Sequence, residues 1–218
     1  MRMMRLLSLH SLSILAASIL NVPIASAHEQ QVLNLETAMA ENGAAAIKIG
    51  VPGHNDAFYG PVPKKDQIFV IDFLEIAPSP IPVDKVFFVL LRGEIPSSHA
   101  GDITADQLAA AKLNITMSLT HPEGDNENED KSLYTIPLRT AELADEAHLA
   151  IRDSQGRHVD SLTAPGTGRN DILTDYWIPG MFVETGKYKF EIVAELEDGR
   201  CLFAIWVEQW LEGSLRRW

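Results

Sequence analysis

The chain has 218 residues, of which 46% are hydrophobic, and its 30 acidic and 18 basic side chains give a formal net charge of −12. A chain of this size and composition can bury enough apolar surface for one domain with a single core. The acidic balance repels phosphate backbones, so we expect no nucleic-acid partner. The single cysteine, Cys201, excludes an intramolecular disulfide. We expect a buried free thiol, the alternative being an intermolecular bridge.

Residues 1–27 have the pattern of a secretory signal peptide. Arg2 and Arg5 precede an apolar run over residues 6–20, and Ala25-Ser26-Ala27 fits a small-residue cleavage site. The apolar run is shorter than the ~20 residues that a membrane-spanning helix needs. We therefore expect a mature protein that begins at His28 and is secreted or held in the lumen of the secretory or vacuolar pathway.

Residues 28–63 show little periodicity, so we expect a loosely ordered arm there, a sandwich domain over 64–213 and a short tail over 214–218. The first strand is predicted over 67–77, where β-branched and aromatic residues alternate and a proline-rich segment follows. Its two rows are Phe69, Ile71 and Phe73 on one side and Ile68, Val70, Leu74 and Ile76 on the other. A second strand is predicted over 86–91.

The middle of the chain contains the clearest alternation. Thr104 and Gln107 have capping-box spacing and predict a short connecting helix. Over 113–119, apolar and polar residues alternate strictly, which predicts a strand with one face in the core. The acidic run over 121–131 lacks the residue order of a calcium loop and is expected to be a solvated loop. Beyond a strand over 133–138, residues 141–149 are ambiguous between a helical turn and a loop, and 149–162 could form a small hairpin.

The strongest pattern is a hairpin near the C-terminus. Residues 188–196 alternate between apolar and mostly charged side chains, Asp198-Gly199 suits a tight turn, and 201–207 form a second apolar run. Both rows of the return strand are apolar, so we expect it to be covered on each side and to be more central than its partner. Together these elements predict an all-β fold, an immunoglobulin-like antiparallel β-sandwich of about seven strands.

Catalytic signatures are missing from the sequence. It has no nucleophile elbow, no phosphate-binding glycine loop and no zinc-binding histidine pair, so we expect neither an enzyme nor a cofactor or metal. One minor alternative concerns His28, whose amine and imidazole at the mature N-terminus could chelate copper. Asn114 opens an Asn-Ile-Thr sequon on the polar row of its strand and is a candidate glycosylation site.

Two segments resemble a known family. VIDFLEIAPSPIPVDKVFFVLLRGEI over 70–95 is similar to the opening of ML lipid-recognition domains, in which a strand ends in a Pro-x-Pro element and a second strand runs to a glycine. TGKYKFEIVAELEDGRCLFA over 185–204 resembles the closing hairpin of that family. The likeness is nearest to the fungal phosphatidylglycerol/phosphatidylinositol transfer proteins. The disulfide cysteines usual in the family are absent here, apart from Cys201.

This resemblance implies a secreted lipid-binding or lipid-transfer protein that holds an acyl chain or a sterol between two splayed sheets. The implied partner is a lipid, phospholipid or sterol, with transient membrane contact. The implied lining residues are Phe69, Ile71, Phe73, Val89, Leu91, Ile115, Met117, Tyr188, Phe190, Ile192, Phe203 and Ile205. The same alternation also fits a filled core, so the alternative is a secreted immunoglobulin-like interaction module that acts through its surface.

Overall fold

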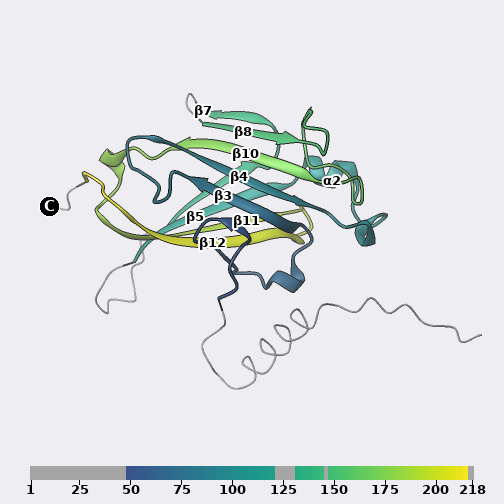
Figure 1. Ribbon diagram of the computed structural model, residues 1–218, viewed down its shortest axis with the longest axis horizontal. Helices are drawn as coiled ribbons and strands as arrows, with labels where there is room; N and C mark the ends of the chain where they lie inside the picture. The colour runs from purple at the N-terminus through teal and green to yellow at the C-terminus, as the bar shows by residue number, and fades with distance from the viewer. Residues whose placement is uncertain (1–47, 121–130, 145–146, 216–218) are drawn as a thin grey trace, which may run out of the picture. The chain divides into compact units, whose positions relative to one another are not determined.

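A computed structural model describes residues 48–120, 131–144 and 147–215. The predicted signal peptide, His28, the rest of the arm up to residue 47 and the acidic run over 121–130 lie outside these residues. The described part consists of two packed β-sheets, which confirms the all-β sandwich (Figure 1). Among the described residues, no helix has the length and apolar character needed to cross a membrane.

The first sheet alone has seven strands, as many as were predicted for the whole sandwich. Its order is β1-β3-β4-β10-β8-β7, and β9 pairs with β8. All neighbours are antiparallel except β1 and β3, which run parallel. The bounds are β1 Gly53–His54, β3 Val70–Ala77, β4 Val86–Glu94, β7 Ala141–Ala144, β8 Ala147–Arg152, β9 His158–Val159 and β10 Asn170–Trp177.

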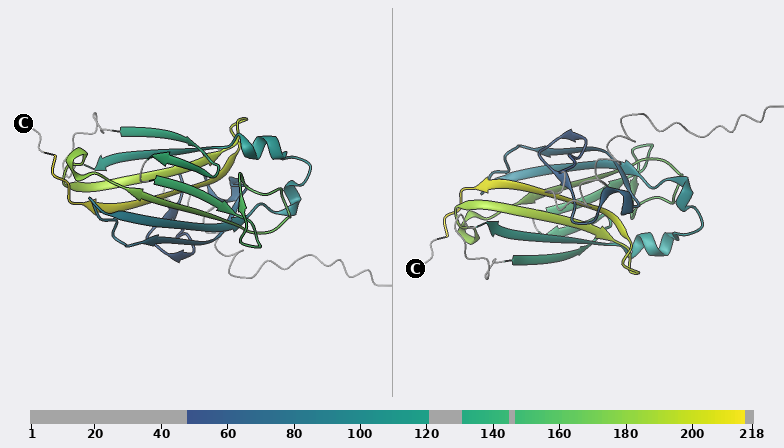
Figure 2. Two further views of the ribbon diagram at one scale, coloured as in Figure 1. Left: turned by 90° about the horizontal axis from the view of Figure 1, so that it is seen from above. Right: turned by 90° about the horizontal axis from the view of Figure 1, so that it is seen from below.

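The second sheet has five strands in the order β2-β12-β11-β5-β6, all antiparallel. The bounds are β2 Phe58–Tyr59, β5 Lys112–Thr120, β6 Lys131–Pro137, β11 Gly186–Glu195 and β12 Cys201–Leu211. Short helices lie near the ends of the strands: η1 Lys64–Asp66, η2 Ser97–His99, α2 Ala105–Ala109 and η3 Gly180–Phe182. Figure 2 shows that α2 lies at one end of the sandwich and the C-terminal residues at the other.

The predicted C-terminal hairpin is present, but the position of its strands differs from the prediction. Strands β11 and β12 pair antiparallel, and Gly199 adopts a φ of 84° in the turn. β11 is the central strand, because β12 and β5 flank almost all of it, whereas β12 has only the two-residue β2 on its other side. Both rows of β12 are nevertheless buried over Leu202–Ile205, since residues 58–69 cover its outer side.

Residues 50–63 were expected in a loose arm and instead belong to the sandwich. Val51 and Ala57 are buried, β1 joins the seven-stranded sheet and β2 joins the five-stranded sheet. Strands of two residues leave no alternation in a sequence, and tertiary contacts hold these two in place. The ambiguous segment over 141–149 is likewise strand, forming β7 and the start of β8.

A bulge changes the rows of the first predicted strand. The register between β3 and β4 shifts between Ile71 and Phe73, so Ile71 and Leu74 both face the core. Phe73 therefore lies on the outer face, where its ring meets His54 edge-on at 5.5 Å. The prediction that Phe73 faces the interior is wrong, because one extra residue in a strand turns the following side chains to the opposite face.

The remaining predicted elements agree with the structure. The capping box is present at α2, where the backbone N–H of Gln107 donates to Thr104 Oγ1 and the backbone N–H of Thr104 donates to Gln107 Oε1. Strand β5 directs Leu113, Ile115, Met117 and Leu119 into the core, as its alternation predicts. The small hairpin over 149–162 forms from β8 and β9.

Candidate functional site

The space between the sheets contains two separate clusters of buried apolar side chains. The larger includes Leu74, Leu91, Leu113 and Phe203 and lies toward α2. The smaller lies toward η3 and contains Ile81, Phe87, Leu119, Ile178, Val183, Tyr188 and Leu211. A sandwich whose sheets are closed along their whole length would bury one continuous core.

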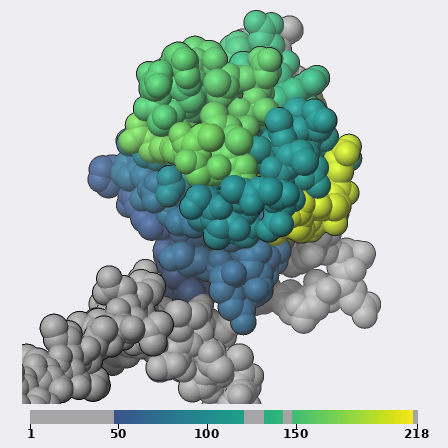
Figure 3. Space-filling model, turned by 90° about the vertical axis from the view of Figure 1, so that its right-hand side faces the viewer, coloured from purple at the N-terminus to yellow at the C-terminus, as the bar shows by residue number. Residues whose placement is uncertain are grey.

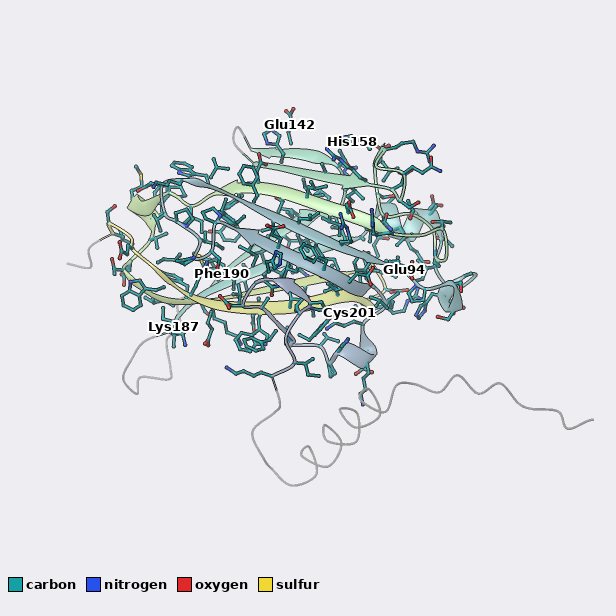
Figure 4. The ribbon with its side chains drawn as sticks, viewed as in Figure 1. Glu94, Glu142, His158, Lys187, Phe190 and Cys201 are labelled. Atoms are coloured by element: carbon teal, nitrogen blue, oxygen red, sulfur yellow. The ribbon has the colours of Figure 1, made fainter. Side chains whose placement is uncertain are left out.

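Between the two clusters lie apolar side chains that are only half-buried although they belong to inner rows. We call them the inner patch: Ile76, Val89, Ile115, Met117, Phe190 and Ile192. Ile76, Val89 and Phe190 pack against both clusters. Figure 4 shows Phe190 between the sheets, whereas Lys187 of the same strand points outward.

The strand register explains why these side chains share one region. Directly opposed residues point to the same face of a sheet, and Phe190 is opposed to Met117, and Ile192 to Ile115. On the facing sheet, Val89 is opposed to Ile76. These pairs lie near the middle of β4, β5 and β11, where a filled sandwich has its most deeply buried residues, and near the end of β3. Their remaining accessible surface means that neighbouring side chains do not fully cover the inner patch.

The accessible side of the interior is marked by two exposed tyrosines on inner rows. Tyr134 of β6 is opposed to Ile115 and is 52% exposed. Tyr176 of β10 is opposed to Phe87, meets its ring edge-on at 6.1 Å and is 43% exposed. The inner faces are therefore reached from the side of β6, at the edge of the five-stranded sheet, and beside the end of β10 that leads to η3.

The α2 end of that side is closed. The chain crosses there from β6 to β7, and Leu138 in the crossing is fully buried, with its backbone N–H donating to the carbonyl oxygen of Ala111 at 2.8 Å. Figure 3 looks onto this end, where the teal and green segments form a continuous surface over the strand ends. The accessible region thus lies away from the α2 end of the sandwich.

The inner rows of the long described strands carry no charged side chain. Their polar members near the inner patch are Ser132, opposed to Met117, Thr174, whose Oγ1 donates to the carbonyl oxygen of His148 at 2.8 Å, and Gln209. Gln209 Oε1 accepts from the backbone N–H of Ile81 at 3.0 Å, and its Nε2 is buried without a hydrogen-bond partner. Such a lining suits an apolar ligand and disfavours a charged one.

The residues predicted to line a pocket fall into three groups. Five belong to the inner patch: Val89, Ile115, Met117, Phe190 and Ile192. Six are buried in the two clusters: Phe69, Ile71, Leu91, Tyr188, Phe203 and Ile205. Only Phe73 lies outside the interior, on the outer face of the seven-stranded sheet. Ile76, Tyr134 and Tyr176 were not predicted to line the interior. The alternation of β6 could have assigned Tyr134 to an inner row. Ile76 was assigned to the wrong row because of the bulge in β3.

Charged side chains lie on the outer faces, in ion pairs. Arg92 Nε donates to Asp171 Oδ1 at 2.8 Å, and Lys187 Nζ lies 2.7 Å from Glu208 Oε2. The hydrogen bond from Lys187 lowers the pKa of Glu208. These pairs link neighbouring strands and have no nucleophile beside them. No group of three or more metal-ligating side chains occurs within the described ranges.

Two single residues singled out in the sequence have defined environments. Burial raises the pKa of the Cys201 thiol to about 11, with a smaller contribution from Glu195. Asn114 lies on the outer row of β5, as predicted, but is half-buried. Its Nδ2 donates to Glu195 Oε1 at 2.8 Å and its Oδ1 accepts from Thr135 Oγ1 at 2.8 Å. A glycan on Asn114 would be attached to this same Nδ2, which would keep one N–H.

Fold and site define a class: an all-β sandwich with a partly accessible, uncharged interior. Comparison with known proteins adds no family to it, because no family model and no curated protein matches the chain. Among solved structures, the chain is similar to the Pseudomonas fluorescens alkylpurine DNA glycosylase AlkC bound to DNA containing an abasic site analogue. The TM-score is 0.33 at 12% identity, over 67% of this chain and 31% of that chain. A likeness of this size carries no argument about function.

Proposed function

We propose that the protein binds a lipid, through an acyl chain or a sterol ring system, between its two sheets and carries it outside the cell or in the secretory lumen. The observation that supports this proposal is the inner patch, whose side chains belong to the central strands and yet keep accessible surface. An apolar ligand in contact with them would remove that surface from water. Each buried methylene contributes ~0.8 kcal/mol, so one chain of ordinary length could offset its transfer out of a bilayer.

The chemistry of the lining favours a carrier over an enzyme. The inner rows of the described strands offer no charge and no base that could activate a hydroxyl, while the hydroxyls of Ser132 and Thr174 could hydrogen-bond one polar group of the ligand. The likeness of residues 70–95 and 185–204 to ML lipid-recognition domains agrees with this reading, and export agrees with the signal-peptide pattern of residues 1–27. The competing function is an interaction module that uses its outer surface and keeps its interior filled.

Ile192 and Val193 provide a matched test. Ile192 belongs to the inner patch, whereas Val193 is the next residue of β11 and faces outward. Ile192→Trp should abolish binding of a fluorescent fatty acid or sterol because it fills the space between the sheets, and it should leave the far-ultraviolet circular dichroism spectrum unchanged. Val193→Trp adds the same bulk outside and should bind the probe like the wild type.

Mass spectrometry of an organic extract of the purified protein would identify the bound lipid class. If the wild-type protein binds no probe, its extract holds no lipid and Ile192→Trp unfolds it, the interior is filled and the interaction module is the better description.

A further inference from the structure

Large apolar side chains are exposed at the end of the sandwich that carries η3. They come from three segments: the start of β4, the η3 turn and the C-terminal residues that follow the middle of β12. The most exposed are Phe182 at 71% and Met181 at 63%. We call the set the apolar tip: Met181, Phe182 and Leu215 at the end itself, with Val86 and Phe88 on the adjoining outer face of the seven-stranded sheet and Trp210 on the adjoining outer face of the five-stranded sheet. In Figure 1 these segments meet at the end marked C, opposite α2.

The backbone of the η3 turn is hydrogen-bonded to Asp84 on one side and to the C-terminal residues 214–215 on the other. The backbone N–H of Gly180 donates to Asp84 Oδ1 at 2.8 Å, and its carbonyl oxygen accepts from the backbone N–H of Ser214 at 2.9 Å. The backbone N–H of Leu215 donates to the carbonyl oxygen of Val183 at 3.0 Å. A Cβ on Gly180 would lie 2.5 Å from Asp84 Oδ2, so only glycine fits this contact. Met181 and Phe182 are therefore presented to the outside by a well-connected turn.

We infer that the apolar tip docks the protein on a lipid bilayer with neutral headgroups. The tip is built from three segments around the end of the sandwich, and a deformable bilayer interface accommodates such a surface more readily than a flat protein face does. Phe, Leu and Trp are side chains that insert at such interfaces. The exposed charges nearby are of both signs: Asp84, Lys85, Lys187 and Glu212.

The net charge of −12 disfavours an anionic surface, because acidic proteins are repelled by phosphatidylserine and similar lipids. This inference rests on the proposed function, because a lipid carrier has to contact a membrane to exchange its lipid. The accessible part of the interior and the apolar tip are close in sequence, because Tyr176 is followed within a few residues by Met181 and Phe182.

Co-sedimentation of the mature protein with phosphatidylcholine vesicles tests the docking. We expect the wild type to sediment, and Met181→Asp/Phe182→Asp to lower the partition coefficient at least tenfold, because two inserted side chains are replaced by charges. Leu133→Asp is the control. Leu133 is 66% exposed, but it is opposed to Thr116 on the outer face of the five-stranded sheet and lies outside the tip. This variant should sediment like the wild type.

Failure of the docking and failure of lipid binding have different signatures. Probe binding without vesicles reports only on the interior, so the Asp/Asp variant should bind the fluorescent lipid like the wild type even when it no longer sediments. Docking is refuted if the wild type stays in the supernatant, or if the Asp/Asp variant sediments equally well. It is also refuted if the wild type is a dimer in gel filtration that the Asp/Asp variant converts to a monomer, because the tip would then be a contact between two copies. Vesicles with added phosphatidylserine should bind less protein than phosphatidylcholine alone.

Discussion

Two phenylalanines on neighbouring strands of one sheet test whether the interior is accessible, because truncating each of them should lower the free energy of unfolding by a different amount. Phe203 of β12 is 2% exposed and packs against Phe69 with ring centroids 5.7 Å apart. Phe190 of β11 faces the same interior but is half-buried. Phe203→Ala should cost ~3–5 kcal/mol, because it removes a fully buried side chain and leaves a cavity that its neighbours cannot close.

Phe190→Ala should cost less, about 1–2 kcal/mol, because this side chain already borders accessible space. Truncation then enlarges that space, and the cavity term of ~24 cal/mol per Å³ largely disappears. For a domain of this size, 1 kcal/mol shifts the thermal midpoint by roughly 2–4 °C. The expected decreases are therefore about 6–20 °C for Phe203→Ala and about 2–8 °C for Phe190→Ala, measured by circular dichroism on ligand-free protein. Equal decreases for the two variants would refute the reasoning, since they would show that Phe190 is packed on all sides.

Two further predictions concern the five-stranded sheet. Cys201 should react slowly with iodoacetamide at pH 8 and fast after unfolding, because its pKa of about 11 keeps it a thiol in the folded protein. Since folding raises this pKa from 9.0, the contribution of the thiol to the free energy of unfolding is present below pH 9 and is lost as the pH rises to about 11. Alkaline denaturation would detect this loss. Rapid labelling of native protein, or a disulfide dimer on a non-reducing gel, would contradict it. Trp206→Ala should cost about 1–3 kcal/mol and make residues 48–60 sensitive to protease, because Trp206 stacks on Phe58 at 4.9 Å and Lys48 Nζ lies 4.7 Å from its ring. Trp210→Ala, at a 58% exposed position, is the control and should leave proteolysis unchanged.

The sequence predicted those parts of the fold whose side chains alternate over many residues. Strands β5 and β11 have strict period-two patterns, and both strands and their inner rows are confirmed. The hairpin turn at Gly199 was predicted for the same reason, because its backbone conformation favours glycine. In these places, local preference and tertiary packing agree.

Other features depend on contacts that a sequence does not display. The bulge at Asp72 follows from pairing with β4 and reverses the rows of Phe73 and Leu74. The central position of β11 depends on which strand adds to its far side, and β5 comes from a segment about 70 residues earlier. The half-buried state of the inner patch is likewise a property of how far apart the sheets lie. Alternation alone is the same for a filled and an open interior.

The pairing of β1 and β2 with different sheets has a mechanical consequence. Only Asn55, Asp56 and Ala57 separate the two strands, and three residues span at most roughly 10–13 Å. Asn55 Nδ2 also donates to the carbonyl oxygen of Leu74 at 2.9 Å, which draws the link toward β3. The edge formed by β3 and β12 is thus tied at a distance close to the normal spacing of packed sheets, ~10 Å. The opposite edge has a link of the same length, because only residues 138–140 separate β6 from β7. Both edges of the sandwich are therefore tied, and the sheets cannot separate freely next to either link.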